Sequence, residues 1–199
     1  MNETAKWEGR ACKGISIEDR RAAGKALREK YPRNALARWK PDPDRTEPLD
    51  ILKAADATRR PELLPLRYGR MLASAFTYYR GSAGVMAADI GRGAHSGLQV
   101  QACGDCHLLN FGGFATPERR IIMDVNDLDE TLPAPWEWDV QRLAASLVLA
   151  ARSLGQSEQA ARDAAEASVR SYRERMRAFS QTDVLDIWYA RVDDSIAEQ

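Results

Sequence analysis

The sequence predicts an α+β protein that is dominated by helices and carries a small β element around residues 98–128. Apolar side chains recur at helical spacing over long stretches on both sides of the middle of the chain. Two short strand candidates, residues 98–103 and 120–125, lie between these stretches. Hydrophobic residues make up 44% of the 199 positions, which is enough to fill a core and excludes general disorder.

The N-terminal half begins with little pattern, so we expect a disordered segment over residues 1–14 and one helix-rich domain, or partial domain, over 15–199. Ser16 can cap a helix that runs to about Lys30, because Pro32 prevents a clean continuation. Three prolines within residues 40–48 predict an extended, solvated linker. Further helices are expected over residues 49–58, 62–73 and 81–90.

The C-terminal half starts with the two strand candidates, after which Pro133 and Pro135 are expected to break the chain. Apolar residues from Val140 to Ala151 then fall on one helix face. A second long helix is predicted over residues 158–180, with Val169, Tyr172 and Met176 on its buried side. The last segment, 183–199, is amphipathic and ends without a Gly cap or polar tail, which indicates a fragment of a longer protein.

Charge and composition exclude several classes of partner. The 29 Lys+Arg balance the 29 Asp+Glu, so a nucleic-acid partner is not expected. The longest nearly apolar run, residues 143–151, is too short for a membrane-spanning helix, which needs about 20 residues. Three cysteines without an apolar export signal indicate a cytoplasmic location.

The residues that carry chemistry gather in a catalytic-loop-like core over residues 98–152. Asp105 precedes Asn110 by the interval that protein kinases keep between the catalytic Asp and a metal-binding Asn. In that chemistry the Asp accepts the proton of a hydroxyl and the Asn holds one Mg²⁺. A second acid has to follow on a short strand, and Asp124, Asp127 and Asp129 all lie in that window. Carboxylate and amide oxygens are suitable ligands for Mg²⁺.

Three segments resemble the motifs of aminoglycoside and choline-type kinases. The first, Gly104-Asp105-x-His107-x-x-Asn110, is similar to their His-Gly-Asp-x-x-x-x-Asn loop. The second, Asp127-Leu128-Asp129, is similar to their Asp-Phe-Gly segment. The third, Asp139-Val140, is similar to the acid that braces the loop from a helix.

More closely, residues 24–193 resemble the bacterial family called domain of unknown function 2252. The segments that carry this resemblance are Arg67-Tyr68-Gly69-Arg70-Met71, Phe76-Thr77-Tyr78-Tyr79-Arg80-Gly81, Cys103-Gly104-Asp105-x-His107-x-x-Asn110-Phe111-Gly112, Asn126-Asp127-x-Asp129-Glu130-Thr131 and Trp136-Glu137-Trp138-Asp139-x-x-Arg142-Leu143.

These resemblances imply a protein-kinase-like catalytic subdomain that uses Mg²⁺ and ATP on an unknown small-molecule or protein acceptor. They imply a larger fold of permuted order, in which a Gly-rich nucleotide segment follows the region present in this chain. A missing C-terminal half or a homodimer would then complete the site. Asp105 is the expected base with His107 beside it, and Asn110 and Asp127 are the expected metal ligands.

Several roles stay open on the sequence alone. Asp127 is favoured over Asp124 as the metal ligand because of its spacing to Asp139, and Asp129 is a secondary candidate. Asp139 and Arg142 are interpreted as structural support for the loop. His107 either orders the loop or contacts phosphate. Three arginines either bind phosphate or hold helices together by ion pairs, namely Arg67, Arg70 and Arg80.

The Cys103-Gly104-Asp105-Cys106-His107 segment also matches the attachment pattern of c-type haem. Such haem belongs to exported proteins, and a zinc site needs four ligands where this segment offers three, so neither haem nor zinc is expected. A thioredoxin-like redox role is equally disfavoured, because no βαβ pattern surrounds the two cysteines. The second function class kept open is a non-catalytic or truncated kinase-like protein that binds a partner or a nucleotide without turnover.

Overall fold

The computed structural model describes residues 15–193, and the chain divides into two units, Met1–Arg38 and Trp39–Gln199. The helix-rich domain, or partial domain, expected over residues 15–199 stays a prediction. The predicted disordered N-terminus, residues 1–14, lies outside the described residues. Each unit is described by itself.

The described part of the first unit is helical. It contains helix α1 (Ile17–Lys30) and the short 3₁₀ helix η1 (Arg33–Ala37). The Ser16 hydroxyl accepts a hydrogen bond from the backbone N–H of Asp19 at 3.0 Å, so Ser16 caps α1 as predicted. None of the residues of α1 is buried.

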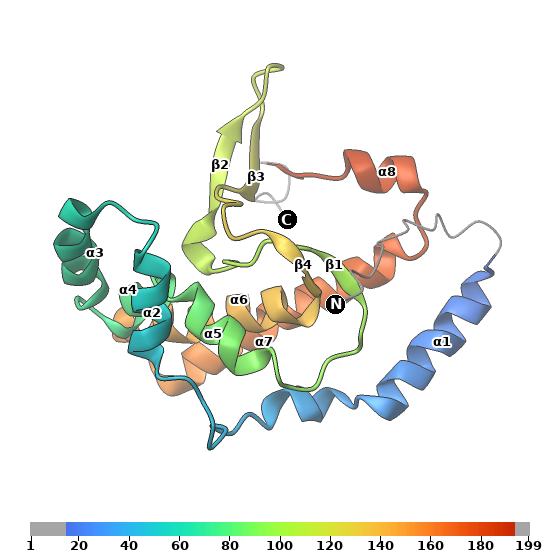
Figure 1. Ribbon diagram of the computed structural model, residues 1–199. Coiled ribbons are helices and arrows are strands. Elements are labelled where there is room, and N and C mark those ends of the chain that lie inside the picture. The colour runs from blue at the N-terminus through green and yellow to red at the C-terminus, as the bar shows by residue number, and fades with distance from the viewer. Residues whose placement is uncertain (1–14, 194–199) are drawn as a thin grey trace. The chain divides into compact units, whose positions relative to one another are not determined.

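The second unit opens with a row of short helices (Figure 1). They are α2 (Pro48–Asp56), the 3₁₀ helix η2 (Pro61–Leu63), α3 (Leu64–Met71), α4 (Ala75–Arg80) and α5 (Ala83–Ile90). Leu52, Met71 and Val85 form a buried apolar cluster between these helices, with Tyr68 and Tyr78 packed against it. The expected linker before α2 is tied down, because Arg45 forms an ion pair with Asp89 of α5 at 2.6 Å.

The β structure forms two small antiparallel sheets. Their elements are β1 (Gln99–Ala102), β2 (Phe111–Ala115), β3 (Ile121–Val125), β4 (Leu132–Pro135) and β5 (Val192–Asp193), with the 3₁₀ turn η3 (Leu108–Asn110) before β2. One sheet pairs β1 with β4, and the other has the order β2-β3-β5. The predicted chain break at Pro133 and Pro135 was wrong, because both prolines lie within β4. Proline cannot donate to a ladder, and a strand with one neighbour tolerates it.

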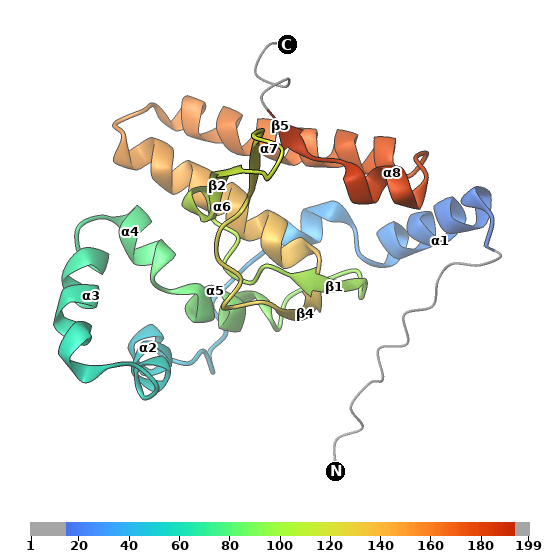
Figure 2. The same ribbon diagram turned by 90° about the horizontal axis from the view of Figure 1, so that it is seen from above.

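Two long helices complete the unit, α6 (Glu137–Ser153) and α7 (Glu158–Phe179), and a short helix α8 (Val184–Tyr189) follows. Figure 2 shows α6 and α7 lying side by side. Gly155 adopts φ +69° between them, a conformation in which glycine has no Cβ penalty. The predicted burial of Val169, Tyr172 and Met176 was wrong, because all three are exposed on α7.

The fold is therefore a helix-dominated α+β structure, as the sequence predicts, with β1 to β4 between helices α5 and α6 in the chain and β5 after α8. Within residues 15–193, no helix combines the length and the apolar character that crossing a membrane requires. Residues 103–110 link β1 to β2, and they pack on α6. This placement positions the candidate site.

Candidate functional site

The segment of residues 103–110, here called the buried loop, is fixed at its start by Asp139 of α6. The two carboxylate oxygens of Asp139 accept hydrogen bonds from the backbone N–H groups of Cys103, at 2.7 Å, and Gly104, at 3.1 Å. Gly104 has φ +81°, and a Cβ at this position would collide with the carbonyl oxygen of Glu130. Only glycine fits at this position, and its positive φ sets the backbone direction in which the loop leaves β1.

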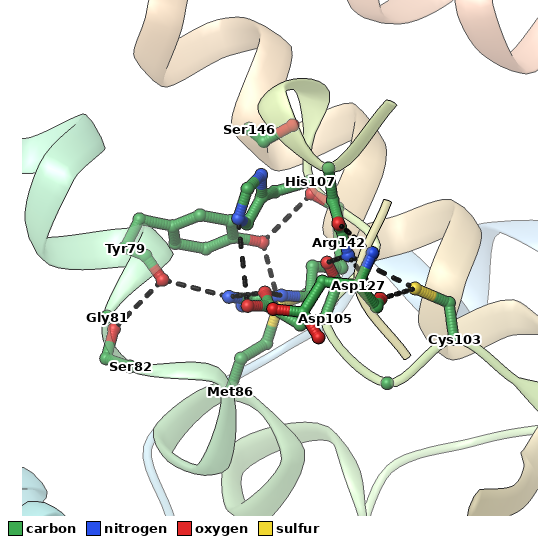
Figure 3. A network of polar contacts seen from close by, with 12 residues as sticks. Tyr79, Gly81, Ser82, Met86, Cys103, Asp105, His107, Asp127, Arg142 and Ser146 are labelled. Atoms are coloured by element: carbon green, nitrogen blue, oxygen red, sulfur yellow. Dashed lines mark hydrogen bonds and ion pairs between the residues drawn. The ribbon is translucent and has the colours of Figure 1, made fainter. Parts of the chain in front are cut away.

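The carboxylate of Asp105 is paired with Arg142, which also comes from α6 (Figure 3). The Nε and Nη2 atoms of Arg142 lie 2.7 and 2.5 Å from Oδ1 of Asp105. Arg142 is 2% exposed, whereas the Asp105 side chain is 22% exposed. The expected base therefore lies at the edge of the interior, with its charge balanced by a buried guanidinium.

His107 lies beside this pair and is 6% exposed. Its Nε2 is 3.7 Å from Oδ2 of Asp105, while its buried Nδ1 has no hydrogen-bond partner among the described residues. Burial lowers the pKa of His107 below 6.5; the charge of Asp105 opposes this shift, and those of Arg80 and Arg142 add to it. The imidazole is therefore neutral near pH 7.

Asn110 ties the buried loop to the segment after β3. Its Nδ2 donates to the carbonyl oxygens of Asp105, at 3.1 Å, and Asp127, at 2.9 Å. Its Oδ1 accepts from the backbone N–H of Asp127 at 2.9 Å, and the residue is only 4% exposed. Here the amide of Asn110 serves backbone groups, and its expected role as a metal ligand stays a prediction.

The three candidate metal acids are exposed and belong to residues 124–130, here called the acidic turn. Oδ1 of Asp127 accepts from the N–H of Asp129 at 3.0 Å, and Oδ1 of Asp124 accepts from the N–H of Val125 at 2.7 Å. Each of these two carboxylates keeps its second oxygen outside these local bonds. In the described residues, no three His, Cys, Asp or Glu side chains are close enough together to hold a metal ion.

The three candidate phosphate-binding arginines lie in different places. Arg67 donates to the carbonyl oxygen of Gly81 at 2.5 Å, and its Nε is 3.9 Å from Asp56, so it connects helices of the row. Arg70 is exposed near the end of α3. Arg80 is exposed, and its charge contributes to lowering the pKa of His107 in the buried loop.

Cys103 and Cys106 are free and buried. Burial raises the pKa of both thiols, that of Cys106 to about 12. Neither is a thiolate near neutral pH, and the sulfur of Cys103 accepts an N–H of Asn110 at 3.5 Å. These two cysteines therefore act as small packing residues around the loop.

Two residues of the site had not been expected from the sequence. Ser146 is fully buried, and its hydroxyl accepts from the N–H of Leu108 at 2.9 Å, which anchors the end of the loop to α6. Tyr79 packs its ring on the guanidinium of Arg142. The only signal for Tyr79 was its place in an aromatic segment, and Ser146 interrupts the apolar run of α6.

Comparison with known proteins adds a family. The model of the family described as "Uncharacterized protein conserved in bacteria (DUF2252)" matches residues 59–199. No curated protein and no solved structure matches the chain. The family match supports the resemblance from residue 59 onward and spans helices α3 to α5, the buried loop, the acidic turn and α6. Because it covers most of the sequence, the chain belongs to the DUF2252 family.

Proposed function

We propose that this chain carries the catalytic loop of a kinase-like phosphotransferase, which moves a phosphoryl group from ATP to the hydroxyl of a small molecule or a protein. The observation that carries the proposal is the bridge made by Asn110. Its side chain holds the backbones of Asp105 and Asp127 together, at 3.1 and 2.9 Å. The expected base and the expected metal acid therefore start from adjacent points of the chain, as phosphoryl transfer requires.

The acidic turn fits a magnesium ion of the kind that nucleotides bring with them. Mg²⁺ keeps several waters and takes one or two carboxylates together with substrate phosphates, so it does not need a cluster of three protein acids. Asp127 is exposed and keeps one oxygen outside its bond to Asp129. Asp127 would hold the ion, with Asp124 or Asp129 as a second ligand. When bound, the ion neutralises charge on the transferred phosphoryl group.

The chain's own residues would position the acceptor. Asp105 is partly exposed, and its Oδ2 is left for a hydroxyl donor, while Oδ1 is held by Arg142. Neutral His107, 3.7 Å from that Oδ2, borders the same edge of the carboxylate. Arg80 is exposed and its charge acts on His107, so of the three arginines we propose Arg80 as the one that meets a phosphate. On the resemblance alone, we also propose that a C-terminal half or a second copy completes the nucleotide site.

A second candidate function is binding of a nucleotide or a partner without turnover. Two contacts favour it. Oδ1 of Asp105 is already paired with a buried arginine, and Oδ1 of Asn110 already accepts a backbone N–H. A carboxylate and an amide engaged in this way are less free to act on a substrate.

A thermal-shift titration with Mg²⁺-ATP tests the nucleotide site. A ligand present at 100 times its Kd stabilises the native state by about 2.7 kcal/mol, which raises the Tm of a chain of this size by about 5 to 10 °C. We expect a rise that needs Mg²⁺ and is lost in Asp127→Ala but kept in Asp163→Ala. Asp163 is an exposed aspartate on α7. No rise in a folded sample would contradict both the phosphotransferase function and nucleotide binding for the isolated chain, and would leave partner binding as the second candidate.

Release of ADP separates the two candidates. If the chain turns over ATP, the rate should depend on Mg²⁺ and disappear in Asp105→Asn, which keeps the shape of the side chain next to Arg142. Asn126→Ala, in an exposed neighbour of Asp127, should retain the rate. A Tm rise without turnover, unchanged in Asp105→Asn, would instead support binding without catalysis.

A further inference from the structure

Arg142 is enclosed by Tyr79, a residue of α4 that lies 63 positions earlier in the chain. The guanidinium lies over the ring of Tyr79, with Cζ of Arg142 4.4 Å from the ring centroid. The carbonyl oxygen of Tyr79 accepts from Nη2 at 2.9 Å, and its hydroxyl lies 3.0 Å from the carbonyl oxygen of Arg142. One tyrosine therefore contacts both the side chain and the backbone of the arginine (Figure 3).

These contacts leave the guanidinium little freedom. A guanidinium that lies over an aromatic face loses that contact when it moves away, and its N–H groups form a rigid fork. Two of its nitrogens, Nε and Nη2, reach the same oxygen of Asp105. The third, Nη1, faces the sulfur of Met86 at 3.8 Å. Tyr79 therefore helps to fix the position of the guanidinium that holds Asp105.

The state of the Tyr79 hydroxyl supports this arrangement. Burial raises the pKa of Tyr79 to about 12, so the hydroxyl keeps its proton and can donate it. Its two possible acceptors are the carbonyl oxygen of Arg142, at 3.0 Å, and the sulfur of Met86, at 2.8 Å. Because one proton serves two acceptors, the hydroxyl contributes less to the arrangement than the ring, whose face covers the guanidinium.

We propose that Tyr79 is a positioning residue for the Asp105 carboxylate, on which it acts through Arg142. The inference rests on the proposed function, in which Asp105 takes the proton of the acceptor hydroxyl through Oδ2. Helix α4 then sets the direction of a carboxylate on a loop that follows it by more than twenty residues. Tyr79 itself does not touch the substrate.

The bond from Nε of Arg142 to Asp105 provides a readout that does not need turnover. Hydrogen exchange of this N–H is measured by ¹⁵N NMR, and its signal is assigned by its loss in Arg142→Lys. We expect Tyr79→Leu, which removes the ring, to speed this exchange by about tenfold. Tyr79→Phe keeps the ring and should change the exchange rate by less than about threefold. Tyr79→Met, whose longer and more flexible side chain can adapt to the gap, replaces Tyr79→Leu if that variant does not fold.

The matched control is Tyr78→Leu. Tyr78 is the neighbouring half-buried tyrosine of α4, and it packs on the Leu52, Met71 and Val85 cluster instead of on Arg142. The Tyr78→Leu substitution should lower the Tm without speeding hydrogen exchange at Nε of Arg142. In the same variants, loss of Tyr79's ring should lower kcat about tenfold and leave KM for Mg²⁺-ATP within about twofold, and Tyr79→Phe should restore kcat.

Unchanged exchange at Nε in a folded Tyr79→Leu or Tyr79→Met variant would overturn the positioning role. Equal acceleration in Tyr78→Leu would do the same, because the effect would then come from general loosening of α4. Absence of turnover in the unaltered protein would overturn the proposed function only, since the exchange measurement still reports whether Tyr79 orients the Arg142–Asp105 pair.

Discussion

The buried loop and the acidic turn are held side by side, yet they are built in opposite ways. In the buried loop nearly every polar group has an internal partner, including the Asp105 carboxylate and the Asn110 amide. In the acidic turn Asp124, Asp127 and Asp129 are exposed, and the carboxylates of Asp124 and Asp127 accept from backbone N–H groups one and two residues further along the chain. The comparison teaches that one segment supplies a rigid frame and the other supplies carboxylates that remain free to bind.

The largest effect is expected from breaking the buried ion pair with Arg142→Leu. The substitution leaves the charge of Asp105 without its partner and removes the stacking on Tyr79. Breaking a buried pair costs about 3 to 5 kcal/mol, and we expect the lower end, about 3 kcal/mol, because Asp105 is partly hydrated. Urea unfolding measures the free energy.

The control for this prediction is Arg152→Leu on the same helix. Arg152 forms an exposed ion pair with Glu158 at 2.7 Å, and solvent screens such a pair. The free energy of unfolding should change little in this variant. If both variants lost the same free energy of unfolding, the buried pair would stabilise the protein no more than the exposed pair does.

The next largest effect is expected at the bridge between the two segments. Asn110→Ala removes the partners of the Asp127 N–H and of two carbonyl oxygens in a buried place. Unpaired buried backbone groups cost about 1 to 3 kcal/mol, so we expect a loss of about 2 kcal/mol in unfolding free energy. Asn126→Ala, at the adjacent exposed position, is the matched control, and a similar loss there would contradict the bridging role.

A pH dependence is expected from His107. Because burial lowers its pKa below 6.5, the unfolded state takes up the proton more readily than the folded state. Its contribution to stability is therefore present above pH 6.5 and is lost as the pH falls through 6.5 toward the folded pKa. Urea unfolding between pH 7.5 and about 5 should show a smaller decline in His107→Gln.

Arg80→Gln sharpens the same test. The charge of Arg80 helps to lower the pKa of His107, so its removal should raise that pKa and shrink the loss of stability at low pH. An unaltered pH dependence in both His107→Gln and Arg80→Gln would show that the decline comes from other groups.

The smallest effect on stability is expected in the acidic turn. Asp127→Ala removes an exposed carboxylate whose one internal bond goes to the N–H of Asp129. Exposed substitutions of this kind usually change the unfolding free energy by less than about 0.5 kcal/mol. The Tm in the absence of ligand should therefore hardly change. A large loss of unfolding free energy would show that the Asp127 side chain stabilises the fold, and the contrast between the two segments would then not hold.

Elements with a strong local signal were predicted closely from the sequence. The Ser16 cap and the helix to Lys30 are present as α1, and the apolar face from Val140 lies within α6. Both strand candidates exist, as β1 and β3. Helical periodicity and capping act between residues a few positions apart, so the sequence displays them directly.

Elements that depend on a distant partner were missed or misread. Strand β4 contains two prolines, and it forms because β1 pairs with it. Val169, Tyr172 and Met176 have the spacing of a buried face, but α7 leaves them exposed. Periodicity indicates which residues share a face, and the packing of other elements decides whether that face is covered.

The sequence by itself determined the helix-rich α+β class, the long helices, two of the strands and the set of polar residues that gather between residues 103 and 142. Only the tertiary structure decided which of those residues are buried and paired and which stay exposed. It buried Asn110 as a bridge, paired Asp105 with Arg142 and placed Tyr79 on that arginine, while Asp127 stayed exposed. The reason is physical: a polar side chain that becomes buried has to find a partner, and here most partners come from parts of the chain far away in sequence.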